Sequence, residues 1–278
     1  MKRLFASILL LATLCTVLLT GCSKDNTEKS NLFNQGLLAV ESDGKFGYIN
    51  NKGKFVINPQ FDDAYAFADN GLARVMVNDK WGFINKKGEY VVNPQFDDAY
   101  PFDDSGLAIV ELNDKYGYIN KKGEYVINPQ FDDAYPFEDN GLARVQSNGK
   151  WGFINKKGEY VVNPQFDDVD SFSENGLAAV QSNDKWGFIN KKGEYIVNPQ
   201  FEFVSGFYNN GLALVSSDDV IGVIDKKGKY VINPQFDGVS GWFDDGYMVV
   251  MFGEKIGVIN EKGKYVINPQ FDDVNFHA

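Results

Sequence analysis

From residue 36 onward, short apolar stretches alternate with polar turns at the spacing of β-strands. In residues 71–105, the stretches Leu72–Val77 and Tyr90–Val92 are rich in β-branched and aromatic side chains, which favour strands. A third apolar stretch, Trp81–Ile84, lies between them. The segment Phe96–Phe102 indicates a weaker, fourth extended piece. Because no stretch has the 3.6-residue period of an amphipathic helix, we predict a β-meander of three or four strands.

The polar segments between these stretches predict tight turns. Asn78-Asp79-Lys80 separates the first two strands, and the equivalent pairs Asp43-Gly44 and Asn148-Gly149 are typical of type I′ hairpins. The next turn ends in Gly88, where a hairpin loop needs a positive φ. Pro94 lacks a backbone donor, so it either ends the third strand or leaves that strand at an edge.

The same pattern repeats every 35 residues without insertion. The tetrapeptide Asn-Pro-Gln-Phe begins at Asn58, Asn93, Asn128, Asn163, Asn198, Asn233 and Asn268. A glycine opens each copy, which divides the chain into repeats 36–70, 71–105, 106–140, 141–175, 176–210, 211–245 and 246–278. A fixed period of this length is the signature of a repeat architecture.

Both faces of each predicted sheet are apolar at mid-strand. Val75 has a valine equivalent in every copy, and Leu72 and Ala73, which point to opposite faces, are apolar in every copy. A sheet with one wet face would instead alternate apolar and polar residues. We therefore expect each small sheet to be packed between its neighbours, since one 35-residue unit cannot bury enough surface to fold alone.

The segment Lys80-Trp81-Gly82-Phe83-Ile84 resembles the WG (or KWG) repeat of bacterial surface and secreted proteins. Its equivalents begin at Lys150 and Lys185, and each is followed by Lys-Lys-Gly and a Pro-x-Phe-Asp segment. The resemblance covers residues 36–278 and implies an all-β repeat module that is usually not catalytic. Ile221 and Ile256 depart from the motif, which suggests structural variants or caps in the last two repeats.

Two arrangements of seven sheets fit this pattern. The predicted fold class is all-β, with the seven repeats forming a closed β-propeller-like ring, because seven is a common blade number and the period never varies. The alternative is an open β-solenoid, because 35 residues are few for a four-stranded blade and the sequence drifts toward the C-terminal end.

The N-terminus predicts export and lipid anchoring. Lys2 and Arg3 precede an apolar run, and Leu19-Thr20-Gly21-Cys22 resembles a bacterial lipobox. This predicts a lipoprotein signal peptide over residues 1–21, lipid attachment at Cys22 and a polar tether over 22–35. The alternative, an uncleaved membrane helix, is disfavoured because the run is short for a span. The expected location is the bacterial cell envelope, outside the cytoplasm and attached to the membrane by lipid.

Composition excludes several classes of function. Hydrophobic residues make up 44% of the chain, which is enough for a core, and the formal charge is −11. That charge argues against nucleic acid as a partner, because nucleic-acid binders need basic surfaces. The single histidine, His277, leaves no histidine-based triad and few metal sites. We expect no cofactor, no metal and no enzymatic activity.

Three repeated features invite a chemical interpretation. Trp81, Trp151, Trp186 and Tyr116 could form a platform for sugars, although isoleucine replaces them in two copies, as a core position would allow. Asp97, Asp98, Asp103 and Asp104 could bind Ca²⁺, although no known calcium-loop spacing is present and Asp is common in turns. The invariant lysines of the Lys-Gly turns could bind a polyanion, or could keep strand edges soluble.

The loops before each Gly-Leu are the best candidates for partner binding. Repeats 71–105 and 141–175 are identical at 26 of 35 positions, and six of the nine differences fall in Ala99–Ser105 against 169–175. Loops that vary on a constant framework commonly carry recognition, although drift without selection would give the same pattern. The candidate partner-binding residues are Tyr65, Tyr100, Tyr135, Asp103 and Asp104.

The sequence as a whole indicates a surface-anchored, non-enzymatic binding or scaffold module for a protein or a cell-wall polymer. Two alternatives stay open. The first is an exported hydrolase that uses the loop carboxylates, and the second is a passive structural spacer.

Overall fold

The computed structural model describes residues 32–242 and 246–273, and this part of the chain is almost entirely β-structure. Its only helix is a single 3-10 turn, η1 (Asn34–Gly36). No helix within these residues is long and apolar enough to cross a bilayer. The predicted signal peptide, Cys22 and most of the tether lie outside the described residues. The all-β prediction is confirmed.

The strands form seven antiparallel sheets, numbered here in chain order. Sheet 1 consists of β1 (Leu38–Ser42), β2 (Lys45–Ile49) and β3 (Phe55–Phe61). Sheet 2 consists of β4 (Asp63–Ala64), β5 (Leu72–Val77), β6 (Lys80–Asn85) and β7 (Tyr90–Phe96). Sheet 3 consists of β8 (Asp98–Ala99), β9 (Leu107–Leu112), β10 (Lys115–Asn120) and β11 (Tyr125–Phe131). Sheet 4 consists of β12 (Asp133–Ala134), β13 (Leu142–Ser147), β14 (Lys150–Asn155) and β15 (Tyr160–Phe166).

The remaining three sheets follow the same order. Sheet 5 consists of β16 (Asp168–Val169), β17 (Leu177–Ser182), β18 (Lys185–Asn190) and β19 (Tyr195–Phe201). Sheet 6 consists of β20 (Phe203–Val204), β21 (Leu212–Ser217), β22 (Val220–Asp225) and β23 (Tyr230–Phe236). Sheet 7 consists of β24 (Gly238–Trp242), β25 (Tyr247–Phe252), β26 (Lys255–Asn260) and β27 (Tyr265–Phe271).

The first strand of sheets 2–7 comes from the end of the preceding repeat. In sheet 2, Asp63 and Ala64 of β4 pair with Met76 and Val75 of β5, although a repeat boundary at Gly71 separates them in the sequence. Sheet 1, by contrast, has three described strands and begins with β1. Neighbouring repeats are therefore joined by backbone hydrogen bonds as well as by side-chain packing.

Both predicted turns have the expected backbone. Asn78 and Asp79 have φ of 52° and 58°, as a type I′ turn requires. Gly88 has φ 81°, and its N–H donates to the carbonyl of Asn85 at 2.9 Å. The Asn85 side-chain oxygen accepts the N–H groups of Lys87 and Glu89 at 2.9 and 3.1 Å, which explains the asparagine at this position.

The Trp-Gly pair lies opposite a bulge that contains Pro94. Trp81 pairs with Phe96 and Phe83 pairs with Val92, so β7 spans four residues where β6 spans two. A Cβ on Gly82 would lie 2.6 Å from the Val92 carbonyl oxygen and from the Pro94 nitrogen. Glycine is needed here because the bulged backbone leaves no room for a side chain. The third strand continues through Pro94 as an edge strand, which is the second of the two outcomes predicted for that proline.

The core lies between successive sheets, as the apolar pattern predicted. Each sheet has a leading face toward the preceding sheet and a trailing face toward the next one. In sheet 2, Ala73, Val75 and Ile84 on the leading face pack against sheet 1. Phe83, Val92 and Phe96 on the trailing face pack against sheet 3. Six such clusters join the seven sheets.

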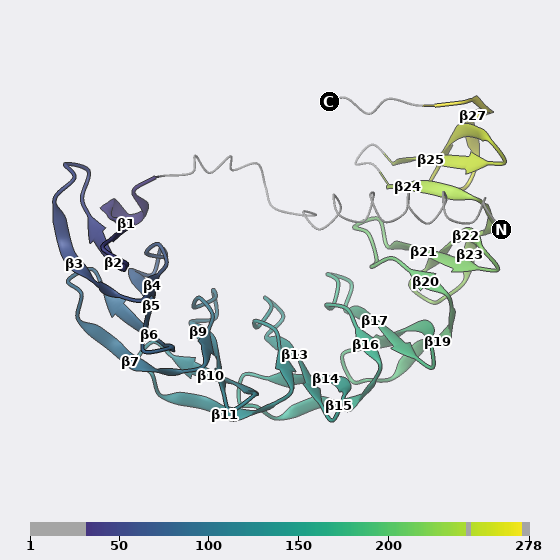
Figure 1. The fold of residues 1–278 in the computed structure, drawn as a ribbon. Helices are drawn as coiled ribbons and strands as arrows, with labels where there is room; N and C mark the ends of the chain where they lie inside the picture. Colours follow the sequence, from purple (N-terminus) through teal and green to yellow (C-terminus); the bar gives the residue numbers. More distant parts are fainter. Residues whose placement is uncertain (1–31, 243–245, 274–278) are drawn as a thin grey trace, which may run out of the picture.

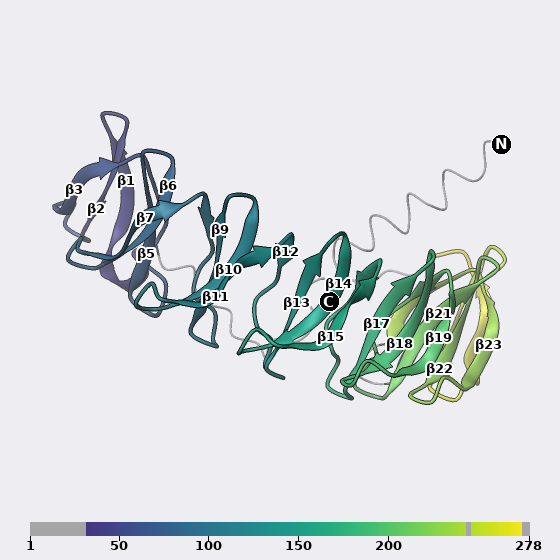
Figure 2. The same cartoon turned by 90° about the horizontal axis from the view of Figure 1, so that it is seen from below.

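The sheets are arranged in an open arc and not in a ring (Figure 1). Sheet 1 and sheet 7 stand on opposite sides of the opening, and the view from below shows the same separation (Figure 2). The predicted ring is therefore wrong, and its alternative, the open β-solenoid, is the observed form. A constant period makes the angle between neighbouring sheets constant, but closure also requires seven such angles to complete a circle.

Candidate functional site

The predicted partner-binding tyrosines lie along the concave side of the arc. Tyr65, Tyr100 and Tyr135 directly follow the short strands β4, β8 and β12, which precede the finger-like loops on the inner side in Figure 1. Their side chains are 49%, 41% and 41% exposed. Each tyrosine N–H donates to a carbonyl on the neighbouring strand, from Tyr65 to Arg74 at 3.0 Å for example. In sheets 2, 3 and 4 the backbone therefore holds one tyrosine at an accessible position.

Two of these tyrosines are stacked with an arginine. The guanidinium carbon of Arg74 lies 4.0 Å from the Tyr65 ring centroid, and Arg144 lies 4.0 Å from the Tyr135 ring centroid. Tyr65 also contacts Trp81, with ring centroids 5.5 Å apart. A guanidinium over an aromatic face is attracted by the ring quadrupole. These contacts restrict both partners before any ligand binds.

The arginines also connect neighbouring sheets. Arg74 Nη1 donates to the backbone carbonyl of Ala99 in sheet 3, and Arg144 Nη1 donates to that of Val169 in sheet 5 at 3.2 Å. Sequence reasoning missed both residues. The available signal was composition, because Arg74 and Arg144 are the only arginines after Arg3, and the equivalent residues of the other repeats are apolar.

The intervening tyrosine has an acidic environment. Ile109 replaces the arginine in that repeat. Burial, followed by the nearby carboxylates of Asp98 and Glu111, raises the pKa of Tyr100. Burial and Glu111 also raise the pKa of Tyr116 to about 12. Arg74 acts in the opposite direction on the pKa of Tyr100, so this tyrosine lies near carboxylates and a guanidinium. Tyr65 and Tyr135, by contrast, each have a guanidinium over the ring.

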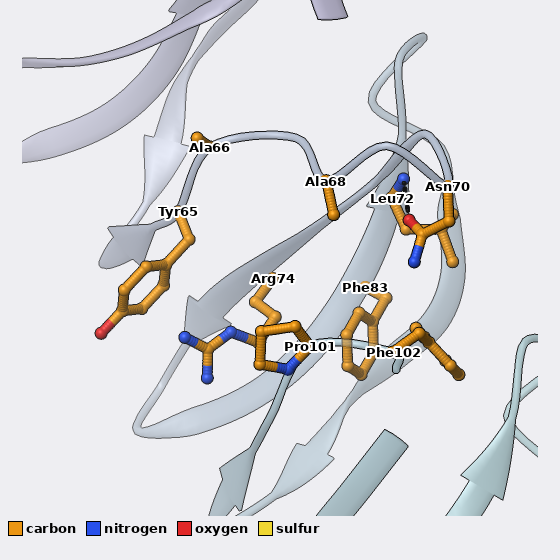
Figure 3. Close-up of a pocket in the computed structure, with 9 residues that line it drawn as sticks. All are labelled: Tyr65, Ala66, Ala68, Asn70, Leu72, Arg74, Phe83, Pro101 and Phe102. Carbon is orange, nitrogen blue, oxygen red and sulfur yellow. Dashed lines mark hydrogen bonds between the residues drawn. The ribbon is translucent and has the colours of Figure 1, made fainter. Parts of the chain in front are cut away.

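A small cavity opens beside the first tyrosine–arginine pair (Figure 3). Its volume is about 160 Å³, below the roughly 300–1,000 Å³ of typical small-molecule pockets. Its lining comes from two consecutive loops, which supply Tyr65 and Pro101, and from strands β5 and β6, where Arg74 belongs to β5. Phe83 and Phe102 form its apolar wall. A cavity of this size can accept one protruding group of a larger ligand.

The two predicted acidic residues have different environments. The Asp103 carboxylate accepts hydrogen bonds from the Ser105 hydroxyl and from the backbone N–H groups of Leu107 and Phe137, the last two at 3.2 and 3.1 Å. It therefore joins its own loop to the loop of the next repeat. Asp104 is exposed at the tip of the turn. Of the pair, Asp104 is the residue that a partner could reach.

Other repeated aspartates are engaged in the structure. Asp97 forms an ion pair with Lys80, and the same contact joins Asp62, Asp132 and Asp167 to their lysines. The lysine hydrogen bond lowers the pKa of each of these four carboxyls. The Asp98 carboxylate accepts the N–H of Ala99 at 2.7 Å. Within the described residues no cluster of three or more acidic, histidine or cysteine side chains could hold a metal ion.

The tryptophans of the repeat motif belong mainly to the packing between sheets. Trp81, Trp151 and Trp186 are half-buried and pack against three different core clusters. Tyr116 occupies the same position in repeat 106–140. This supports the core interpretation over a free-standing sugar platform, although the tyrosines stacked on Trp81 and Trp151 remain accessible.

Comparison with known proteins is informative at the level of the repeat. A family model described as "WG containing repeat" matches residues 46–81, 81–116, 116–151, 151–186, 186–220, 221–255 and 256–277. No curated protein matches the chain significantly.

Several solved structures align with most of the chain at low similarity. A eukaryotic initiation factor aligns at 11% identity and a TM-score of 0.45, over 84% of this chain and 74% of the other. Hsv2p of Kluyveromyces lactis aligns at 11% identity and a TM-score of 0.39, over 86% and 95%. The extracellular domain of BT4673, a putative one-component system from B. thetaiotaomicron, aligns at 11% identity and a TM-score of 0.34, over 81% and 39%. With TM-scores below 0.5, none of these structures establishes a shared fold or function.

Proposed function

The chain belongs to the WG containing repeat family, and we propose that this member is a non-enzymatic binding module for an extended protein or cell-wall polymer. The observation that carries the proposal is the strip formed by Tyr65, Tyr100 and Tyr135, whose side chains are 41–49% exposed. These residues begin the loops on the concave side of sheets 2, 3 and 4 (Figure 1). An extended polymer can contact several equivalent sites at once. Weak contacts at single repeats then combine into a useful overall affinity.

The state of the carboxylates supports binding over hydrolysis. A general acid needs a raised pKa, whereas the lysine partners lower the pKa of Asp62, Asp97, Asp132 and Asp167. Burial does raise the pKa of one carboxyl, Asp170, while Arg144 acts in the opposite direction. The four carboxylates that are ion-paired with lysine are therefore better suited to holding structure or a ligand than to donating a proton.

A set of matched substitutions tests the strip. The triple variant Tyr65→Ala/Tyr100→Ala/Tyr135→Ala removes the three concave rings. The control, Val126→Ala/Val161→Ala/Ile196→Ala, removes three apolar side chains of similar exposure from β11, β15 and β19 on the convex edge. A protein of residues 31–278 is tested in two ways. When immobilised, it should capture a partner from a bacterial cell extract, or in solution it should sediment with purified peptidoglycan. The concave variant should lose this binding by more than tenfold, and the control should retain it.

A loop exchange tests the same strip by removing only one of its three rings. Residues 99–105 are replaced by the sequence of 169–175, in which Asp170 and Ser171 stand in place of Tyr100 and Pro101. Both loops make the same backbone hydrogen bonds, and Phe102 and Phe172 are buried alike. The exchange should therefore leave the protein folded, with a lower melting temperature because the Asp103 contact to Phe137 is lost. It should weaken binding by more than about 1.4 kcal/mol, a factor of ten. Unaltered binding in both the exchange and the concave variant would favour the passive spacer.

We propose further that the module is held at the cell envelope through lipid on Cys22. The proposal rests on the apolar run and the lipobox-like Leu-Thr-Gly-Cys of the sequence. Cys22→Ala should release the protein from membranes or leave it unprocessed at precursor size. If the variant fractionates with membranes at mature size, as the wild type does, the anchor is not at Cys22.

A further inference from the structure

The trailing face of sheet 7 is an exposed copy of a surface that is buried in every other sheet. Ile267 is 38% exposed and Phe271 is 52% exposed. Their equivalents in sheets 1–6 are at most 4% and 2% exposed. An exposed apolar sheet face of this kind marks an interaction surface.

The leading face of sheet 1 is incomplete in a complementary way. Leu38, Val40 and Ile49 are half-buried, whereas their equivalents in sheets 2–7 are at most 1% exposed. In sheets 2–7 the preceding repeat donates a strand that lies at the edge of the sheet. In sheet 1 the described residues include no strand at that edge, beside β1. The surface at this end therefore matches what a preceding repeat normally covers.

The internal junctions of the chain show what fits these two faces. At each of six junctions, the trailing face contributes a phenylalanine and either isoleucine or valine. The leading face that packs on it contributes a valine, an isoleucine and either alanine or methionine. The donated strand then adds backbone pairing, as Asp63 and Ala64 do with β5. The sequence Asp272-Asp273-Val274 after β27 repeats Asp62-Asp63-Ala64, with valine as in Asp168-Val169.

We propose that the protein associates head to tail with a second copy of itself, so that the trailing face of sheet 7 packs on the leading face of sheet 1 of the next copy. Asp272 and Asp273, which follow β27, would then lie beside β1, with Asp273 opposite Glu41 by the register of β4 and β5. The open arc keeps these faces apart within one chain (Figures 1 and 2). Because the interface is heterologous, each added copy presents the same two faces again.

Site-specific photo-crosslinking in intact bacteria tests the contact in the full chain. Phe271 is replaced by p-benzoylphenylalanine, and the same replacement at Tyr160 on the convex edge is the control. Irradiation should give dimers and larger species from position 271 only, with crosslinked peptides that map to residues 36–50 of another copy. A crosslink within one chain would mean that the arc closes, and crosslinks to other regions or none at all would equally overturn the proposal.

A charge substitution tests the energetics independently of crosslinking. Phe271→Asp places a carboxylate on the trailing face of sheet 7, and Val126→Asp alters a residue of β11 that is 40% exposed. In sedimentation velocity of the full chain in a non-ionic detergent, the wild type and Val126→Asp should form larger species as concentration rises. Phe271→Asp should remain monomeric at tenfold higher concentration. Equal behaviour of all three proteins would refute head-to-tail association, and because the concave strip is intact in each, the result would not bear on the proposed binding function.

Discussion

The phenylalanine of the Asn-Pro-Gln-Phe tetrapeptide offers a direct test of how the array is stabilised. Phe131 is 1% exposed and belongs to the cluster between sheets 3 and 4. Its ring meets that of Tyr160 from the next sheet edge-on, at a centroid distance of 6.2 Å. Phe271 has the same neighbours along its own chain segment but is 52% exposed. The two residues therefore differ mainly in the presence of a following sheet.

Truncating a fully buried Phe to Ala costs about 3–5 kcal/mol, through lost transfer free energy and the cavity that remains. We expect Phe131→Ala to lower the free energy of unfolding by an amount in this range. Phe271→Ala removes a ring that is already half in water, so its cost should be below about 1.5 kcal/mol. The expected difference between the two variants is at least about 1.5 kcal/mol, from the same two estimates.

Urea unfolding followed by circular dichroism measures both values, at a low protein concentration that keeps the exposed face of sheet 7 without a partner copy. The slope of the free energy against urea should stay similar, since both variants unfold the same array. Equal losses for Phe131→Ala and Phe271→Ala would refute the reasoning. Such a result would mean that the stability comes from within each sheet and not from the contact between sheets.

Three further predictions concern the bulge, one lysine–aspartate ion pair and one buried carboxyl. Gly117→Ala should destabilise or prevent folding, since a Cβ there would lie 2.6 Å from the Ile127 carbonyl oxygen and the Pro129 nitrogen; an unchanged melting temperature would contradict the close approach. Lys80 lowers the pKa of Asp97, so this pair stabilises the folded protein above the unfolded pKa, and the contribution disappears as pH falls through the folded pKa. Lys80→Met should therefore lose less stability than the wild type as pH falls below about 4. An acid titration identical to that of the wild type would exclude this contribution. Burial raises the pKa of Asp170, so the wild type loses stability as pH rises from about 4 to about 7. Asp170→Asn should remove this loss, and should therefore be more stabilising relative to the wild type at pH 7 than at pH 4. Thermal melts in which both proteins respond alike to pH would contradict this.

Most of the fold within one repeat follows from local sequence. The strands could be predicted because successive side chains of a strand point to opposite faces. In Leu72–Val77 and its equivalents, both of these faces are apolar. The type I′ turns and Gly88 are readable because positive φ restricts the choice of residue. The pairing of β4 with β5 across the repeat boundary was not predicted, because the segment Asp63–Ala64 is too short to carry a pattern.

The candidate site was predicted in part. The position of the loop tyrosines followed from the comparison of repeats. The stacking of Arg74 on Tyr65 did not, because these residues belong to different repeats and meet only when β4 pairs with β5. The contact from Asp103 to the N–H of Phe137 spans 34 residues and likewise depends on how one loop lies over the next.

The sequence by itself determined the period, the strands, the turns and the two buried faces of every sheet, because each of these depends on residues that are close along the chain. Only the tertiary structure decided between a ring and an open arc. That choice depends on the angle between neighbouring sheets, which is set by how their side chains pack. A repeated sequence indicates that the packing recurs, but it does not give the size of the angle. The exposed faces of sheets 1 and 7 follow from the same angle, since the six junctions between the seven sheets leave the array open.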